Sequence, residues 1–93
     1  MNISFLKLEE NGLRSLANIE KLQKLESLFL SGNRLSDFNE LDKLCELENL
    51  VELVLTSNPI IRKNMYRATV IKKLPQLVIL DGRVRKIIFL IIN

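Results

Sequence analysis

The side chains that could perform catalysis are few, and their spacing matches no familiar catalytic site. The chain contains no histidine, the usual general base at neutral pH, and its one cysteine, Cys45, lies in an apolar stretch that predicts a buried core thiol. The acidic pairs Glu9–Glu10 and Asp37–Glu40 are expected in solvated turns and caps. Neither a phosphate-binding glycine loop nor metal-ligand spacing appears. We therefore expect no catalytic residue, no metal and no cofactor.

A set of basic residues near the C-terminal third of the chain has the chemistry to bind phosphate groups. The set, expected on a helix near 64–73 and its approach, comprises Arg62, Lys63, Arg67, Lys72 and Lys73. No aromatic stacking platform or RNA-binding motif accompanies it, and the formal charge of +3 permits an anionic partner without requiring one. A solvated helix face is the preferred interpretation. Ribonucleoprotein association through this basic patch is the alternative, with direct nucleic-acid binding not expected.

Three asparagines recur at one position of a repeated motif. Asn11, Asn33 and Asn58 each lie three residues after a Leu-x-Leu, in "LKLEENGL", "LFLSGNRL" and "LVLTSNPI". Backbone groups buried in a tight turn need hydrogen-bond partners, and an asparagine amide supplies both donors and an acceptor. We expect a ladder of asparagines that bond to their own turn and to the neighbouring one. The alternative is three ordinary turn residues.

The apolar residues around each asparagine repeat with the same spacing, which predicts a repeat protein. Four units align in three columns, namely Ile3, Leu25, Leu50 and Leu74; Leu6, Leu28, Leu53 and Leu77; and Leu8, Leu30, Leu55 and Ile79. Side chains alternate between the two faces of an extended strand. We therefore expect strands near 5–9, 27–31, 52–56 and 76–80, with these leucines on the buried face. The repeats span about 3–24, 25–49 and 50–73, within a single domain of residues 1–93.

Each strand is expected to return through a helical or 3₁₀ segment, because apolar residues recur every three positions between the strands. The second return segment begins after Asp37, a suitable N-cap. In the last segment, the helix near 64–73 should face inward with Met65, Tyr66, Thr69, Val70 and Leu74. At 47% hydrophobic residues, the chain has enough apolar side chains to fill a core between the two layers.

These units fit the pattern L-x-x-L-x-L-x-x-N-x-L and so resemble the leucine-rich repeat family, in its class of short, 22-residue repeats. Residues 61–84 resemble the C-terminal cap of that class, with the landmarks Tyr66-Arg67, Val70-Ile71, Leu74-Pro75 and Leu80-Asp81-Gly82. The resemblance implies an α/β right-handed solenoid with a parallel sheet on its concave face. It also implies non-catalytic binding to a protein, such as a phosphatase, a cytoskeletal or axonemal component, or a ribonucleoprotein subunit.

The two ends of the chain depart from the family pattern. No N-terminal cap precedes Ile3, so we expect an unpaired first strand that promotes self-association, as in a terminal fragment of a longer array with no binding of its own. Residues 85–93 form an apolar tail, for which a strand or plug over the last repeat is expected and a membrane anchor is the alternative. The apolar run of the tail, 87–92, is shorter than the roughly 20 residues of a membrane-spanning helix.

The strand residues that alternate with the leucines should face outward on the concave side. We expect Phe29, Val54 and Val78 to form an apolar column, with Phe29 as the anchor for a partner. Good strand-forming residues without a binding role are the alternative. The predicted partner-binding residues are Phe5, Lys7, Phe29, Ser31, Glu52, Val54, Thr56, Gln76 and Val78. The lone cysteine fits a reducing compartment, so a cytoplasmic or nuclear location is expected.

Overall fold

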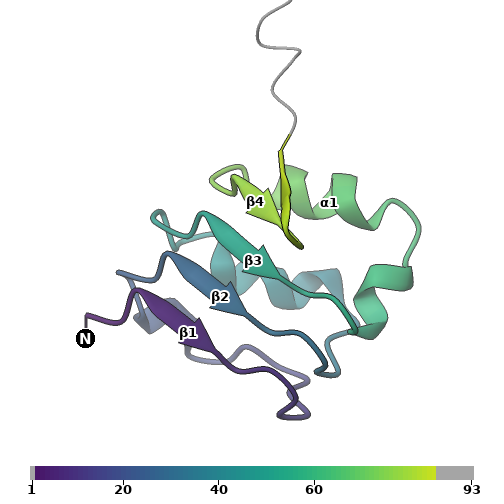
Figure 1. Ribbon diagram of the computed structural model, residues 1–93, viewed down its shortest axis with the longest axis horizontal. Helices are drawn as coiled ribbons and strands as arrows, with labels where there is room; N and C mark the ends of the chain where they lie inside the picture. The colour runs from purple at the N-terminus through teal and green to yellow at the C-terminus, as the bar shows by residue number, and fades with distance from the viewer. Residues whose placement is uncertain (1, 86–93) are drawn as a thin grey trace, which may run out of the picture.

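The computed structural model describes residues 2–85, which form one sheet of five strands backed by a layer of short helices (Figure 1). Strands β1 to β4 are parallel and neighbour one another in sequence order, whereas β5 is antiparallel to β4. The strands are β1 (Phe5–Lys7), β2 (Ser27–Phe29), β3 (Glu52–Val54), β4 (Ile79–Leu80) and β5 (Arg83–Val84). This arrangement confirms the predicted α/β solenoid, although each strand is shorter than expected.

The return segments are 3₁₀ and α-helical, as the spacing of apolar residues predicts. They are the 3₁₀ helices η1 (Ile19–Lys21), η2 (Phe38–Leu44) and η3 (Pro59–Arg62), followed by the α-helix α1 (Tyr66–Lys73). Asp37 is the N-cap of η2, because its carboxylate accepts a hydrogen bond from the Asn39 amide at 2.8 Å. We call one strand together with its return segment a coil.

The core lies between the sheet and the helical layer and consists almost entirely of leucine. In the second and third coils, the leucines at the repeated positions are fully buried, among them Leu28, Leu30, Leu53 and Leu55 at 0% exposure. The corresponding residues of the first coil, Ile3, Leu6, Leu8 and Leu13, are only partly buried against this core. A coil packs only against its immediate neighbours, and within residues 2–85 the first coil has one neighbour.

In the fourth coil, the predicted alignment is wrong by three residues. Leu53 pairs with Leu80 rather than with Leu77, so the aligned leucines Leu6, Leu28, Leu53 and Leu80 lie 22, 25 and 27 residues apart. The last coil is longer because it contains a full α-helix in addition to η3. The error arose because leucines recur every three residues before each strand, so that a shift of three positions still aligns leucine with leucine.

Two residues expected in the core are instead at the surface. Cys45 is exposed, and its thiol lies 3.5 Å from the Lys73 carbonyl oxygen. In η2 the inward positions are Leu41 and Leu44, and a 3₁₀ helix has three residues per turn, so the position after Leu44 faces outward. Met65 is 67% exposed because it precedes α1 in a left-handed conformation. The predictions for residues 86–93 of the apolar tail lie outside the described residues.

A network of hydrogen bonds joins α1 to the end of the sheet. The Tyr66 hydroxyl donates to one oxygen of the Asp81 carboxylate at 2.6 Å, while the other oxygen accepts from the Leu55 amide at 2.6 Å. The Arg67 guanidinium donates to the carbonyl oxygens of Leu80 and Arg83. The residues that resemble the landmarks of a C-terminal cap therefore link the last helix, the third coil and strands β4 and β5.

Candidate functional site on the concave face

The exposed face of the sheet is built from two rows of side chains that cross the parallel strands. Hydrogen-bonded register aligns Phe5, Ser27, Glu52 and Ile79 in the first row and Lys7, Phe29 and Val54 in the second. The residues between them, Leu6, Leu28, Leu53 and Leu80, point the opposite way into the core. Alternation along each strand therefore separates the core from this outer face, as the sequence predicts.

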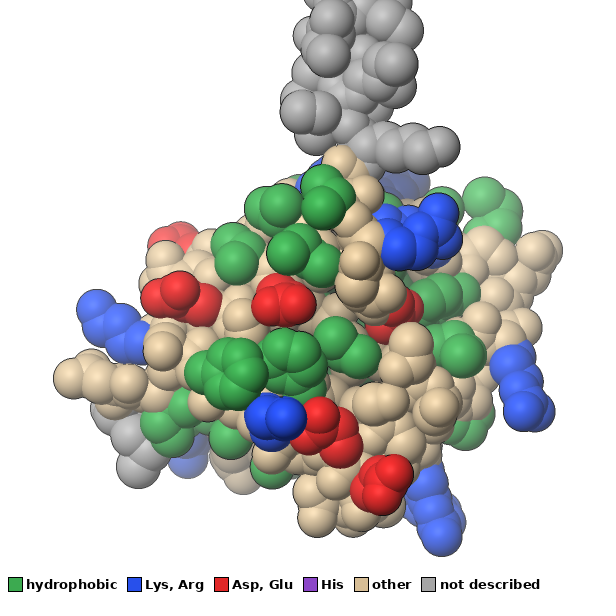
Figure 2. All heavy atoms as spheres, in the orientation of Figure 1, with side chains coloured by type: hydrophobic (Ala, Val, Ile, Leu, Met, Phe, Trp, Pro, Cys, Tyr) green, Lys and Arg blue, Asp and Glu red, His purple; other side chains and the backbone are tan. Residues whose placement is uncertain are grey.

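Apolar side chains form a continuous diagonal strip across the two rows. The rings of Phe5 and Phe29 pack with their centroids 4.9 Å apart and their planes tilted by 49°. Phe29 lies beside Val54 in the second row, and Val54 lies diagonal to Ile79 of the first row. We call these four residues the concave strip. Figure 2 shows hydrophobic side chains gathered over strands β1 to β3, with charged side chains around them.

Polar side chains border the concave strip and are partly engaged with one another. The Ser27 hydroxyl donates to Glu52 Oε1 at 3.1 Å, while Ser31 and Thr56 share a hydrogen bond of 2.8 Å between their hydroxyl oxygens. Lys7 Nζ lies 3.9 Å from a Glu9 carboxylate oxygen. An apolar centre with a polar border is the usual composition of a protein-binding surface.

The structure places two of the predicted concave residues elsewhere. Gln76 lies on the helical side, where its amide donates to the carbonyl oxygens of Leu44 and Leu47. Val78 precedes β4 and is 48% exposed, but it is not aligned with Val54. Both misplacements follow from the shift of three residues in the fourth coil. Sequence reasoning missed Ile79 as a residue of the exposed face of the sheet. If Leu80, the last of the three leucines Leu74, Leu77 and Leu80, had been aligned with Leu53, Ile79 would have been assigned to that face.

The asparagine ladder is formed by two of the three predicted residues. Asn33 is buried, donates to the carbonyl oxygens of Leu8 and Leu30, and accepts from the Asn11 and Leu13 amides. Asn58 is buried in the next coil, where it repeats this role.

Asn58 accepts from the Leu35 amide and donates to three carbonyl oxygens, those of Leu30, Leu55 and Thr56. Asn11 is exposed, and its side-chain amide donates to the Glu9 carbonyl oxygen of its own turn. The asparagine at this position therefore links two coils only where a preceding coil is present.

Three of the five predicted basic residues contact other groups of the protein. Arg67 bonds to backbone carbonyls within the cap, and Lys73 Nζ lies 2.6 Å from Asp42 Oδ1, a contact that raises the pKa of Lys73. The ammonium of Lys63 lies 5.7 Å from the centre of the Phe38 ring. The interpretation of the set as a solvated helix face is therefore wrong for Arg67, whose guanidinium holds the end of the sheet.

Besides Lys73, two ionisable groups of the described residues have shifted pKa values, and both lie in contacts that stabilise the fold. The Lys43 ammonium and the Leu16 amide hold the pKa of Glu40 below its usual range by hydrogen bonds to the carboxylate. Burial, and then the bond to Asp81, raise the pKa of the Tyr66 hydroxyl. Both groups already bond to the protein, so neither is poised as an acid or base for a substrate.

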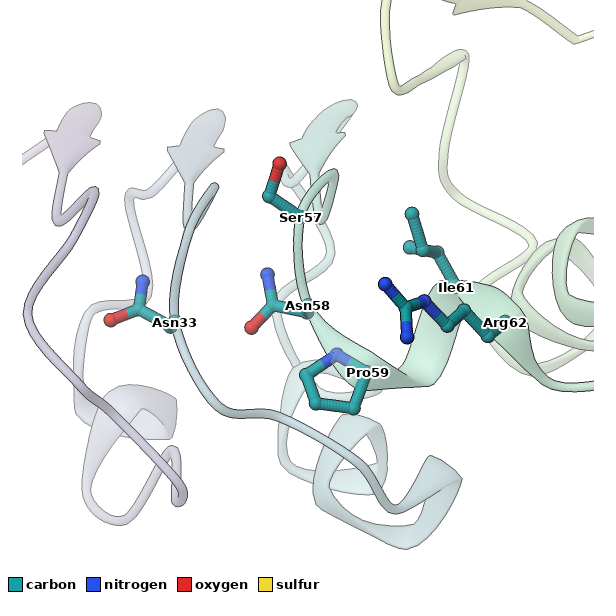
Figure 3. Close-up of a pocket in the computed structure, with 6 residues that line it drawn as sticks. All are labelled: Asn33, Ser57, Asn58, Pro59, Ile61 and Arg62. Carbon is teal, nitrogen blue, oxygen red and sulfur yellow. The ribbon is translucent and has the colours of Figure 1, made fainter.

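A pocket of about 500 Å³ lies off the concave face, beside the turns that follow β2 and β3. Figure 3 shows its walls, formed by Asn33, Ser57, Asn58, Pro59, Ile61 and Arg62. The amides of Asn33 and Asn58 are committed to backbone groups. The pocket therefore combines a structural turn with one exposed cation and holds no pair of acid and base groups.

Comparison with known proteins places the chain among repeat proteins. The leucine-rich repeat family profile matches residues 2–88. The acidic leucine-rich nuclear phosphoprotein 32 family member A of Drosophila melanogaster is 39% identical over 82 residues, or 87% of this chain and 31% of that protein. The chain spans only 31% and 20% of the lengths of the first two curated relatives that it matches.

Two solved structures show the same fold. The leucine-rich repeat domain of Mex67 from Chaetomium thermophilum matches 98% of this chain and 64% of its own, with 29% identity and a TM-score of 0.79. A chain of the Drosophila melanogaster SNF/U2A' complex matches 90% of this chain and 62% of its own, with 28% identity and a TM-score of 0.68. Among the described residues, no helix has the length and apolar character needed to cross a membrane.

Proposed function

Because this chain belongs to the leucine-rich repeat family, we propose that it is a non-catalytic module that binds a partner protein through the concave strip. The observation that carries the proposal is the strip itself, in which Phe5, Phe29, Val54 and Ile79 cross all four parallel strands. Apolar side chains gathered on one exposed face favour burial against another protein. Phe29 is the expected anchor, because it contacts Phe5 and lies beside Val54 at the centre of the strip.

The spacing of the strip suits a helical segment of the partner. Neighbouring strands lie about 4.8 Å apart, while an α-helix rises about 5.4 Å per turn. A helix laid across the strands therefore presents one side chain to each coil, at positions that lie three or four residues apart. Glu52 lies within the first row beside Ile79, so a lysine or arginine on the same helix face would complement the strip.

The relatives support a protein partner without identifying it. The SNF/U2A' structure is a complex. The relative from Drosophila is named as a nuclear phosphoprotein, which agrees with the cytoplasmic or nuclear location that we propose for this chain. The partner classes that we propose are a ribonucleoprotein subunit, a phosphatase, and a cytoskeletal or axonemal component.

The test is an affinity capture from cell lysate that compares the wild-type chain with Val54→Asp, with proteins identified by mass spectrometry. Ala68→Asp is the matched control, because Ala68 is an exposed residue of α1 on the opposite layer. Circular dichroism first establishes that all three chains fold. We expect a set of proteins that Val54→Asp loses and that Ala68→Asp retains.

A parallel capture treated with RNase separates the two partner classes. Proteins that survive RNase and depend on Val54 support direct binding through the strip. If Val54→Asp changes nothing and the captured set disappears with RNase, the concave strip is not the binding site. The same capture with Lys72→Glu plus Lys73→Glu then tests the basic patch.

A further inference from the structure

The first coil leaves apolar surface at the end of the core. Phe5 is 56% exposed, and Leu6, Leu8 and Leu13 are only partly buried, although the equivalent residues of the next coil, Leu28, Leu30 and Leu35, are at 0% exposure. Within residues 2–85, no strand pairs with the side of β1 that faces away from β2. We call this side the open edge.

The backbone amide and carbonyl groups of β1 point alternately to its two sides. Leu8 and Glu10 donate their amides to the carbonyl oxygens of Phe29 and Ser31, and the Ser4 carbonyl accepts from the second coil, so even-numbered residues face β2. In a strand, successive residues direct their amide and carbonyl groups to opposite sides. The backbone groups of Phe5 and Lys7 therefore point to the open edge, where they offer two donors and two acceptors to another strand.

The opposite end of the sheet differs, because its core is covered and its edge strand, β5, has only two residues. Strand β5 runs antiparallel along β4, and the Arg67 guanidinium bonds to Leu80 and Arg83, one residue from each of these strands. Leu77 and Leu80 are 2% and 1% exposed there. A head-to-tail contact would need two complementary ends, whereas a symmetric contact needs only the open edge.

We propose that the open edge binds the open edge of a second copy of this chain, as an antiparallel strand pair with its two-fold axis at Leu6. In this register Phe5 of each copy lies opposite Lys7 of the other, and the two pairs exchange four backbone hydrogen bonds. The Leu6 side chains of the two copies meet on the core side of the sheet. The two cores thereby join across the axis.

The sequence of β1 suits this register. No two like charges lie directly opposite each other, because Lys7 faces Phe5, whose ring can stack against the lysine side chain. The contact is closed, because both copies contribute the same open edge to one two-fold pair. The concave strips of the two copies then lie on one continuous sheet, in which Phe5 is shared between the strip and the dimer contact.

The first experiment is sedimentation velocity of the wild-type chain over a wide range of concentrations, with Lys7→Pro and Lys7→Ala beside it. Proline removes the amide that points to the open edge and is tolerated on an edge strand, whereas alanine keeps that amide. We expect a wild-type dimer, a dimer of similar affinity for Lys7→Ala, and dimerisation at least tenfold weaker for Lys7→Pro, which lacks two hydrogen bonds per dimer. Circular dichroism establishes that both variants fold.

Hydrogen exchange supplies a measurement that needs no variant. The amides of Phe5 and Lys7 should exchange more slowly at high than at low protein concentration, while the Leu55 amide, bonded to Asp81, should not change. A monomer at all concentrations, a dimer that persists in Lys7→Pro, or concentration-independent exchange at Phe5 and Lys7 would each overturn the proposal. Val54→Asp should remain dimeric, so the capture experiment can fail while this proposal holds.

Discussion

The first coil and the capped end of the molecule carry similar leucines in different surroundings. Leu6 is only partly buried, whereas its equivalent Leu80 is 1% exposed. The difference lies in what covers each end. Leu80 belongs to a strand that is paired on both sides, and the cap network of Tyr66, Arg67 and Asp81 holds that region to the third coil.

This contrast shows that the same repeat position contributes differently to stability in different coils. The contribution of a leucine depends on whether a second coil or a cap lies on each side of it. The same holds for the asparagines, because the Asn33 side chain bridges two coils and the Asn11 side chain bonds within its own turn. Binding and stability should therefore be separable in the first coil, where core residues are already partly exposed.

The largest expected effect is on the leucines of one repeat column. Leu55→Ala and Leu30→Ala should each lower the free energy of unfolding by about 2–5 kcal/mol, because a fully buried side chain leaves a cavity. Leu8→Ala should cost less than about 2 kcal/mol, because Leu8 is only partly buried. Urea denaturation followed by circular dichroism measures all three. Equal losses at Leu8 and Leu55 would show that the first coil is as well packed as the third.

A smaller effect is expected at the asparagines. Asn58→Ala should cost about 1–3 kcal/mol, because it leaves the buried Leu35 amide and the Leu55 carbonyl without their partner. Asn11→Ala should change stability by less than about 0.5 kcal/mol, as for other exposed residues. The same denaturation measurement compares them. If Asn11→Ala lowered the free energy of unfolding as much as Asn58→Ala, the conclusion that the Asn11 side chain does not link two coils would be wrong.

The smallest effect is expected at the cap. Tyr66→Phe removes the hydroxyl that donates to Asp81 and should cost about 1–2 kcal/mol. Hydrogen exchange provides the finer measurement, since the Leu55 amide bonds to the same carboxylate and should exchange faster. Faster exchange confined to β1 instead would show that the cap does not hold the end of the sheet. Ile71→Val, at another partly buried position of α1, is the control for a general loosening of the helix.

Much of the fold followed from the sequence because its signals are local. The spacing of Leu28, Leu30 and Asn33 specifies a strand and a turn within one repeat, and the next repeat confirms it. The fourth coil was misaligned because leucines spaced by three residues permit two alignments. Only pairing between strands, an interaction between distant residues, distinguishes Leu77 from Leu80.

The candidate site was predicted in its centre and misplaced at its edge for the same reason. Phe29 and Val54 lie side by side as expected. On β4, however, the exposed face is continued by Ile79 rather than by Gln76 and Val78. The basic residues show a further limit of sequence reasoning. Composition gathers Arg67 and Lys73 into one set, but the fold commits the first to backbone carbonyls and the second to Asp42.

By itself, the sequence determined the repeated strand, the leucine core, the asparagine turns and the class of fold, because each depends on the alternation of side chains along a short segment. The tertiary structure alone decided the register of the last coil, the exposure of Cys45, the role of Arg67 and the unequal burial of equivalent leucines. Each of these depends on which coil or cap lies beside the residue, and that neighbour is distant in the chain.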